Sequence, residues 1–179
     1  RVASYCGYSL MTAKSIEWFP SLEQQPQAIA LVDGDRELSY EDLNHSVNRV
    51  IAGLLDGEAS LNEERVAFLY PASFEYASLI IAIVAAGGIA VPLSVHASAD
   101  ELSHCLSVSG VKRLLLPESL RSGGLDRVCE QLSVTQLSVA DLPDTASPAS
   151  LPITPEQGAL IVFTSGTTGQ PKAVVHTVE

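Results

Sequence analysis

The chain has 179 residues, of which 46% are hydrophobic and 6% aromatic, enough to build the core of one domain and too many for a chain disordered throughout. Its 21 acidic and 10 basic side chains give a formal net charge of -11, which repels nucleic-acid backbones and anionic membrane surfaces. Nucleic acid is therefore a poor candidate partner, and any phosphate ligand has to be held locally by backbone N–H groups and a placed lysine.

The cysteines and the first residues bear on the compartment. Cys6, Cys105 and Cys129 are odd in number and far apart, which suggests neither a disulfide framework nor a zinc site and fits a reducing compartment. The segment after Arg1 lacks the apolar core and the cleavage site of a secretory signal. We therefore expect a cytoplasmic protein, or a mitochondrial or other organellar one if a transit segment has been removed.

The first part of the chain predicts a hairpin followed by a long helix. The Asp-Gly-Asp turn at Gly34 separates two short predicted strands, as in a hairpin. Ser39 and Asp42 then form a capping-box pattern in front of apolar residues at helical spacing. In chain order we predict a short helix at 16–20, strands at 28–32 and 37–40, and a helix at 40–55.

The next part alternates strands and helices. Short, continuously apolar runs are typical of strands buried on both faces. The most apolar stretch, residues 76–93, is broken by Gly87, Gly88 and Pro92, which favours helix, turn and strand over a membrane span. The alternation predicts an α/β fold with a mostly parallel sheet and helices on both faces. The predicted strands are 65–69, 89–93, 113–116 and 134–137, and the predicted helices are 74–86, 99–108 and 125–132.

A loop and a glycine-rich motif follow. Residues 143–155, rich in Ser, Ala, Thr and Pro, predict a linker or surface loop. Apolar strands at 160–163 and 173–175 flank the motif, whose two glycines let backbone N–H groups converge while a serine and three threonines add hydroxyls. The motif consists of Thr164, Ser165, Gly166, Thr167, Thr168, Gly169, Gln170, Pro171 and Lys172.

This motif is a candidate anion-binding loop. Lys172 lies where a flexible cation can close on a polyphosphate, and Pro171 stiffens the exit that presents it. One alternative is an ordinary Gly/Ser/Thr turn with a solvated lysine. Another is the P-loop of nucleoside triphosphatases, but that pattern places Lys directly after Gly, whereas two residues separate Gly169 from Lys172 here.

The string from Thr164 to Lys172 resembles the phosphate-binding signature of the adenylate-forming (AMP-binding) superfamily, which includes acyl-CoA synthetases, peptide-synthetase adenylation domains and luciferases. Residues 38–44 resemble the segment leading into that family's first large helix. Residues 65–93 resemble its next strand–helix–strand unit. The resemblance covers residues 16–176.

Two positions depart from the family pattern. Phe163 stands where the family often has Tyr, and Ala173 stands where it usually has Gly. We expect Ala173 to be tolerated.

The resemblance implies a two-step reaction. A small-molecule carboxylate attacks the α-phosphate of Mg²⁺-bound ATP to give an acyl-adenylate, and a thiol, expected to be coenzyme A, then captures the acyl group. The loop residues are implied to hold the β- and γ-phosphates and to neutralise charge on the departing pyrophosphate. They are Thr164, Ser165, Gly166, Thr167, Thr168, Gly169 and Lys172. No catalytic residue and no metal ligand is assigned within the chain.

Three interpretations remain open within this resemblance. We prefer an acyl-CoA synthetase, because Ser94, Val95 and His96 resemble synthetases of the malonyl and short-chain type, where peptide-synthetase domains usually carry an acidic residue. The second is an amino-acid adenylation domain of a peptide synthetase. The third is a non-catalytic nucleotide-binding module.

The domain interpretation is a partial N-terminal AMP-binding domain over residues 1–179, with a linker-like loop at 143–155 and the phosphate-binding loop at 164–172. We expect the acidic metal ligand, the nucleoside contacts, the acyl pocket and a C-terminal adenylation lysine to lie beyond Glu179. The chain alone is therefore expected to be inactive.

The remaining polar residues carry weaker signals. His176 follows the loop, but a single histidine at a strand end is more often structural. Glu63–Glu64 and Asp100–Glu101 are interpreted as solvated helix starts, and the cysteines as buried or inert. The other histidines have no spacing that suggests metal or triad chemistry; they are His45, His96 and His104.

Overall fold

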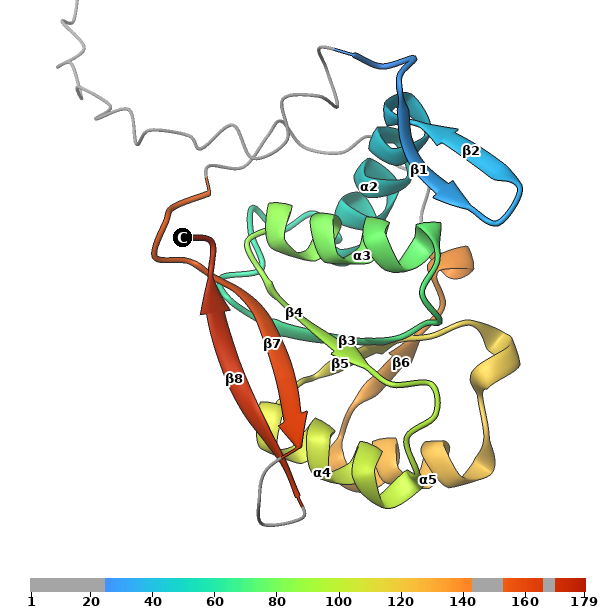
Figure 1. Ribbon diagram of the computed structural model, residues 1–179. Helices are drawn as coiled ribbons and strands as arrows, with labels where there is room; N and C mark the ends of the chain where they lie inside the picture. The colour runs from blue at the N-terminus through green and yellow to red at the C-terminus, as the bar shows by residue number, and fades with distance from the viewer. Residues whose placement is uncertain (1–24, 143–152, 166–169) are drawn as a thin grey trace, which may run out of the picture.

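The computed structural model describes residues 25–142, 153–165 and 170–179 (Figure 1). Within these ranges the chain forms a two-stranded sheet and a six-stranded sheet. The short helix predicted at 16–20 and most of the loop predicted at 143–155 lie outside the described residues.

The two-stranded sheet is the predicted hairpin. β1 (Ile29–Asp33) and β2 (Arg36–Ser39) are antiparallel, with Asp33 opposite Arg36. Gly34, in the turn between them, has a φ of 61°, a left-handed conformation that glycine adopts without the steric cost a Cβ brings.

The six-stranded sheet has the order β6-β5-β3-β4-β7-β8, and its neighbouring strands are parallel except β7 and β8. Helices α2 and α3 cover one face and α4 and α5 cover the other (Figure 1), which confirms the predicted fold class. The elements are α2 (Tyr40–Leu55), β3 (Arg65–Leu69), α3 (Phe74–Ala85), β4 (Ile89–Leu93), α4 (Ala99–Ser109), β5 (Arg113–Leu115), η1 (Glu118–Leu120), α5 (Gly123–Leu132), β6 (Thr135–Leu137), η2 (Val139–Asp141), β7 (Gly158–Ser165) and β8 (Pro171–Thr177).

The connections reverse direction in the middle of this sheet. The chain passes from β3 through α3 to β4, and then returns through α4 to β5, which lies on the other side of β3. Because such crossovers are right-handed, the reversal puts α3 and α4 on opposite faces (Figure 1). In sheets of this type, ligands bind at the carboxyl ends of the strands beside the reversal.

Each central strand packs against both helical layers. In β3, Val66 and Phe68 belong to the core shared with α2 and α3, whereas Ala67 and Leu69 belong to the core shared with α4 and α5. Successive side chains of a strand point to opposite faces, and these four are at most 4% exposed. A strand buried on both faces is apolar at every position, which explains the continuous apolar runs in the sequence.

The helix ends follow local signals. Ser39 Oγ accepts a hydrogen bond from the Asp42 N–H at 3.2 Å, and the Asp42 carboxylate accepts from the Ser39 N–H at 2.9 Å, so the predicted capping box is confirmed. Ser98 and Glu101 cap α4 in the same way. After α3, Gly87 takes a φ of 80°, which stops the helix where the sequence predicted. Of the helices in the described ranges, none is both long and apolar enough to cross a bilayer.

The start of β7 is held by side chains from distant segments. Glu63 Oε1 accepts from the Gly158 N–H at 2.9 Å, and Gln157 Nε2 donates to the Val84 carbonyl at 3.1 Å. The interpretation of Glu63 and Glu64 as a solvated helix start is therefore wrong. Glu63 lies in a turn and Glu64 directly before β3, and both carboxylates accept hydrogen bonds because the folded chain brings donors from other elements to them.

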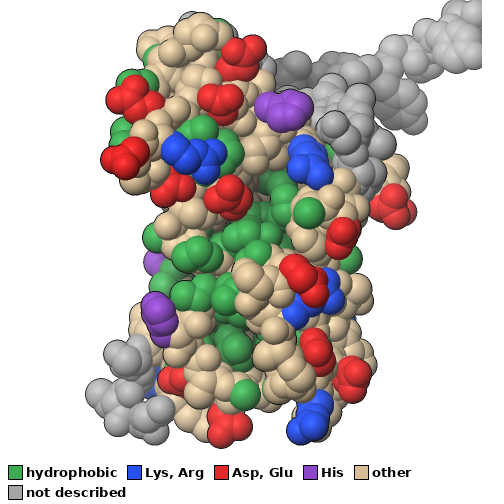
Figure 2. All heavy atoms as spheres, turned by 90° about the vertical axis from the view of Figure 1, so that its right-hand side faces the viewer, with side chains coloured by type: hydrophobic (Ala, Val, Ile, Leu, Met, Phe, Trp, Pro, Cys, Tyr) green, Lys and Arg blue, Asp and Glu red, His purple; other side chains and the backbone are tan. Residues whose placement is uncertain are grey.

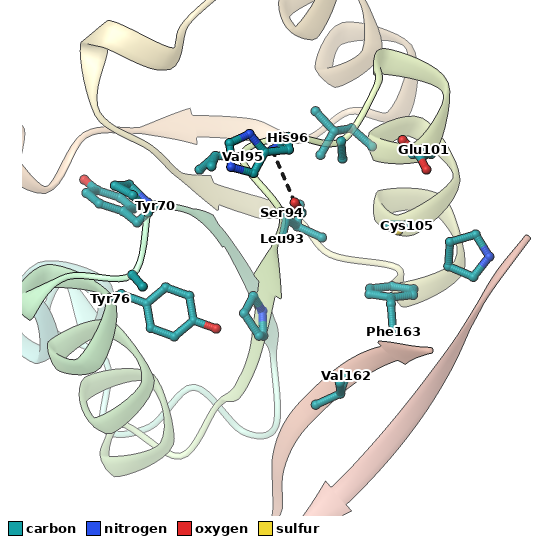
Figure 3. A pocket seen from close by; sticks show the side chains of 16 residues that line it. Tyr70, Tyr76, Leu93, Ser94, Val95, His96, Glu101, Cys105, Val162 and Phe163 are labelled. Carbon is teal, nitrogen blue, oxygen red and sulfur yellow. Dashed lines mark hydrogen bonds between the residues drawn. The ribbon is translucent and has the colours of Figure 1, made fainter. Parts of the chain in front are cut away.

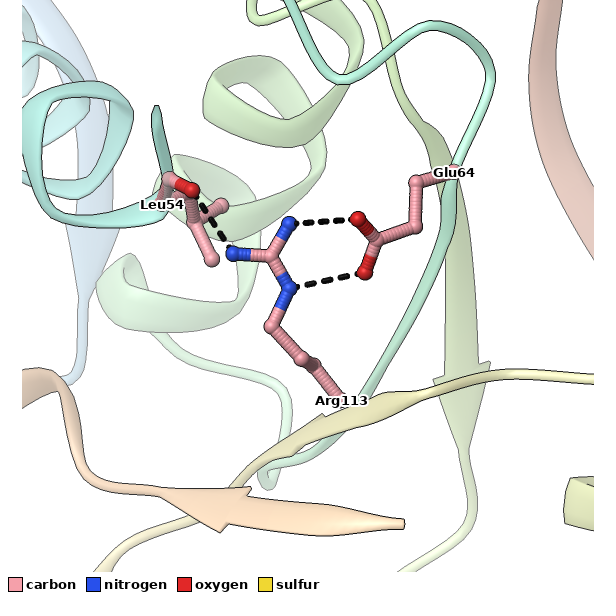
Figure 4. Close-up of polar contacts among 3 residues, drawn as sticks. All are labelled: Leu54, Glu64 and Arg113. Carbon is pink, nitrogen blue, oxygen red and sulfur yellow. Dashed lines mark hydrogen bonds and ion pairs between the residues drawn. The ribbon is translucent and has the colours of Figure 1, made fainter. Parts of the chain in front are cut away.

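An ion pair joins three elements at the amino-terminal ends of the strands, opposite the end that carries their carboxyl termini (Figure 4). Arg113, at the start of β5, donates from Nε and Nη2 to the Glu64 carboxylate, each at 2.8 Å, and from Nη1 to the Leu54 carbonyl at 2.7 Å. The side chains are 20% and 32% exposed for Arg113 and Glu64. The guanidinium therefore connects the end of α2 with the starts of β3 and β5.

Removal of this guanidinium is expected to destabilise the fold. Arg113→Ala leaves a half-buried carboxylate and a carbonyl without their donor, which costs about 2 kcal/mol of unfolding free energy. The matched control is Arg121→Ala, whose i,i+3 partner Glu118 is 82% exposed, with an expected change within about 0.5 kcal/mol. Urea unfolding midpoints measure both, and equal values for the two variants would contradict the assignment.

The two described cysteines are expected to be unreactive at neutral pH. Burial, followed by a nearby carboxylate, raises the pKa of both the Cys105 and the Cys129 thiols, which are 7% and 2% exposed. Since the thiolate is the nucleophile, iodoacetamide should label them at pH 7 at less than about a tenth of the rate of free cysteine, with labelling rising as pH increases through the raised pKa. Peptide mass spectrometry resolves the two sites, and labelling in urea is the control. Rapid labelling of the folded protein at pH 7 would show that the thiols are not buried in solution.

Candidate functional site

The glycine-rich motif lies in the hairpin formed by β7 and β8. Thr164 and Ser165 are the last two residues of β7, and Lys172 is the second residue of β8. Their pairing puts Thr164 opposite Lys172 and Ser165 opposite Pro171. The rest of the predicted phosphate-binding set lies outside the described residues: Gly166, Thr167, Thr168 and Gly169.

The two sides of β8 face different surroundings. Lys172 and Thr164 are exposed, whereas Pro171 and Ala173 are partly buried. Ala173 packs against the core shared with α4 and α5, so its methyl group occupies a place in the fold. The hairpin thus presents an ammonium group and a hydroxyl group to solvent from neighbouring strands, a combination suited to an anion.

A pocket of about 520 Å³ adjoins the hairpin at the carboxyl ends of β3, β4 and β7. Figure 2 shows hydrophobic side chains gathered in a hollow across this face, between the two helical layers. The pocket lies beside the chain reversal between β3 and β4, where α/β sheets bind ligands. Its walls come from several elements (Figure 3): Tyr70, Pro71, Ala72, Tyr76, Pro92, Leu93, Ser94, Val95, His96, Ala97, Glu101, Leu102, Cys105, Val162, Phe163 and Pro171.

The pocket is lined by residues of both β4 and β7, whose shared ladder is short. These strands share a single residue pair, Ala90 with Leu160, although β4 remains paired with β3 through Pro92 and Leu93. Pro92 has no N–H to donate, so it cannot extend a ladder toward β7. Phe163, near the end of β7, lines the pocket.

The polar groups of the pocket are mostly neutral. Burial raises the pKa of the Tyr70 and Tyr76 phenols, and burial together with Glu101 raises the pKa of the Cys105 thiol. Hydrogen bonds from the backbone N–H and the hydroxyl of Ser98 lower the pKa of the Glu101 carboxyl. At neutral pH the two phenols and the thiol are therefore protonated, and the Glu101 carboxylate is the acidic group of the pocket that is ionised.

The histidines occupy separate positions. His45 is exposed on α2, and His176 is exposed on β8 opposite Leu160. His96 lines the pocket, in the loop after β4. His104 Nε2 lies 2.9 Å from the Pro171 carbonyl oxygen, which links α4 to the hairpin. Among the described residues, no group of three or more His, Cys, Asp or Glu side chains is arranged to hold a metal ion.

Two features of the site were not predicted. The pocket residues Tyr70 and Tyr76 follow the carboxyl end of β3. The rule that ligands bind at the carboxyl ends of parallel strands could have identified them from the sequence. The contact between His104 and Pro171 joins positions 67 residues apart, and no local pattern marks it.

Several known proteins are similar to this chain in sequence. A plipastatin synthase subunit of Bacillus subtilis (strain 168) is 29% identical over 163 residues, which cover 88% of this chain and 6% of that protein. Phosphinothricin tripeptide synthetase PhsC of Streptomyces viridochromogenes is 33% identical over 159 residues, which cover 87% of this chain and 14% of that protein.

A similar solved structure is O-succinylbenzoate coenzyme A synthetase (MenE) from Bacillus subtilis in complex with AMP. It superposes with a TM-score of 0.75 at 25% identity, covering 89% of this chain and 42% of that one. The chain therefore spans less than half the length of each of these three relatives. The model of the AMP-binding enzyme family matches residues 18–179, and the chain accordingly belongs to the AMP-binding enzyme family.

Proposed function

We propose that the protein activates a carboxylate with ATP by forming an acyl-adenylate. A carboxylate oxygen attacks the α-phosphorus of ATP, the bond from that phosphorus to the oxygen bridging to the β-phosphate breaks, and pyrophosphate leaves with the electron pair. The observation that carries the proposal is the family match over residues 18–179, which includes the whole β7–β8 hairpin.

In this proposal the loop of the hairpin holds the β- and γ-phosphates. Lys172 neutralises the negative charge that grows on pyrophosphate as it leaves, and the backbone N–H and hydroxyl groups fix its oxygens. The exposed positions of Thr164 and Lys172 on adjacent strands support these roles. The residues proposed are Thr164, Ser165, Gly166, Thr167, Thr168, Gly169 and Lys172.

The overall charge makes this local arrangement necessary. These 179 residues carry a net charge of -11 and repel ATP at long range, so binding to this part of the protein depends on groups within a few ångströms of the phosphates. Mg²⁺ enters the proposal as the ion that accompanies ATP and neutralises part of its charge, and we assign none of the described residues as its ligand.

The proposed domain assignment follows the family match. Residues 1–179 form the N-terminal part of an AMP-binding domain, with a linker-like segment at 143–155 and the phosphate-binding loop at 164–172. Support comes from the structural similarity to MenE, of which this chain covers 42%.

Coenzyme A is the proposed acceptor of the acyl group. In the second step its thiol sulfur attacks the acyl carbon, the bond from that carbon to the adenylate oxygen breaks, and AMP leaves as the thioester forms. Support comes from the similarity to MenE, which is named a coenzyme A synthetase, and from Ser94–His96, where no acidic residue follows the Val-Pro-Leu segment.

A second candidate is amino-acid activation for a carrier-bound thiol. Phosphinothricin tripeptide synthetase PhsC, a peptide synthetase by name, favours it. The chemistry of the first step is the same for both candidates, so they differ in the acid and in the thiol acceptor.

Carboxylate-dependent ATP–pyrophosphate exchange tests the first step. With the full-length product of the gene that encodes this chain and a panel of short-chain acids, including malonate, and amino acids, we expect exchange with one acid class. Lys172→Ala should lower the rate about 100-fold, because it removes one positive group aimed at the leaving phosphates.

Lys112→Ala is the matched control, since Lys112 is an exposed lysine before β5 and should leave exchange unchanged. Absence of exchange with every acid, from a folded full-length protein, would contradict the enzyme proposal and favour a nucleotide-binding module.

The acceptor is tested by adding thiols to the enzyme with its preferred acid and ATP. We expect an acyl-CoA product, detected by mass spectrometry, when coenzyme A is present. Product only with a phosphopantetheine-bearing carrier domain, combined with an amino acid as the preferred acid, would replace the first candidate with the second.

A further inference from the structure

A hydrogen bond connects helix α4 to the exit of the candidate phosphate-binding hairpin. The Nε2 atom of His104 lies 2.9 Å from the carbonyl oxygen of Pro171. A carbonyl oxygen only accepts, so Nε2 must carry the proton and donate it. The bond therefore fixes the ring orientation and requires a proton on Nε2.

The acceptor is the residue next to the lysine proposed to bind phosphate. Pro171 is the first residue of β8 and Lys172 is the second, opposite Thr164 of β7. β8 is at the end of the strand order and pairs with β7 alone among the described strands. Its outer side thus has no described strand to fix it, and α4 supplies a contact from one face of the sheet.

The donor is held on a well-anchored helix. α4 starts at the Ser98–Glu101 capping box. Its buried residues near His104 are Leu102, Cys105 and Leu106. Ala173, two residues after Pro171, packs against the same core. The Ala173 side chain lies on the face of β8 opposite Lys172, and the hydrogen bond holds the backbone of the residue before Lys172.

We propose that His104 is a positioning residue, which holds the start of β8 so that the Lys172 side chain points away from α4 toward the bound phosphates. This inference rests on the proposed function of the hairpin. His104 does not touch the substrate in this role. It limits the positions that the Lys172 backbone can take, and charge stabilisation at a transition state is sensitive to shifts of about 1 Å.

Two substitutions at position 104 separate the effect of the hydrogen bond from the effect of side-chain volume. His104→Gln places an amide N–H near the position of Nε2 and retains the hydrogen bond to the Pro171 carbonyl. His104→Leu fills a similar volume without a donor. We expect the leucine variant to lower kcat/KM for MgATP about tenfold, with the KM for the carboxylate unchanged, and the glutamine variant to stay within about twofold of wild type.

A double-mutant cycle tests whether His104 acts through Lys172. If His104 acts through Lys172, then His104→Leu should cause no further loss in the Lys172→Ala background, because the group that it positions is absent. The matched control is His45→Leu on α2, an exposed histidine far along the chain from the hairpin, which should leave both KM values unchanged.

Each outcome bears on the inference separately from the proposed function. Equal losses in the glutamine and leucine variants, or additive losses in the double mutant, would show a structural role only and overturn the inference while wild-type exchange stands. Failure of the wild type to exchange pyrophosphate with any acid would overturn the proposed function itself, and the positioning role with it.

Discussion

Burial of the central sheet on both faces is the constraint on which the rest of this structure depends. Val66 and Phe68 enter one core and Ala67 and Leu69 the other, so these positions of β3 leave no room for a polar side chain. Polar and ligand-binding groups are consequently confined to the strand ends and to the edge hairpin. The ion pair of Arg113 with Glu64 lies at one end of the sheet, and the pocket with the candidate phosphate-binding hairpin lies at the other.

The candidate site combines two surfaces of different character. The hairpin offers Lys172 and Thr164 to solvent, and the neighbouring pocket offers aromatic rings and neutral hydroxyl groups from Tyr70 and Tyr76. A charged polyphosphate suits the first surface and an uncharged organic group suits the second. Both lie toward the carboxyl ends of the strands, because Val162 and Phe163 of β7 line the pocket and the same strand continues into the candidate phosphate-binding hairpin.

Much of the fold was predictable because its signals are local. The Ser39–Asp42 capping box, the stop at Gly87 and the apolar strand at 65–69 depend on residues a few positions apart, and the structure confirms them. Strand lengths in the hairpin were less predictable: β7 and β8 extend beyond the apolar runs because pairing, not side-chain polarity, decides where they end.

Contacts between distant segments were not predictable from one sequence. Glu64 is 49 residues from Arg113, and His104 is 67 residues from Pro171, so nothing nearby in the sequence marks either pair.

The attachment of β7 also has a consequence for assembly during synthesis. Glu63 precedes its partner Gly158 by 95 residues, so β3, β4, β5 and β6 can form their sheet before that partner is made. Until β7 is synthesised and paired, β4 would be an uncovered edge strand, a template for pairing with another chain, and in the folded chain β7 covers that edge.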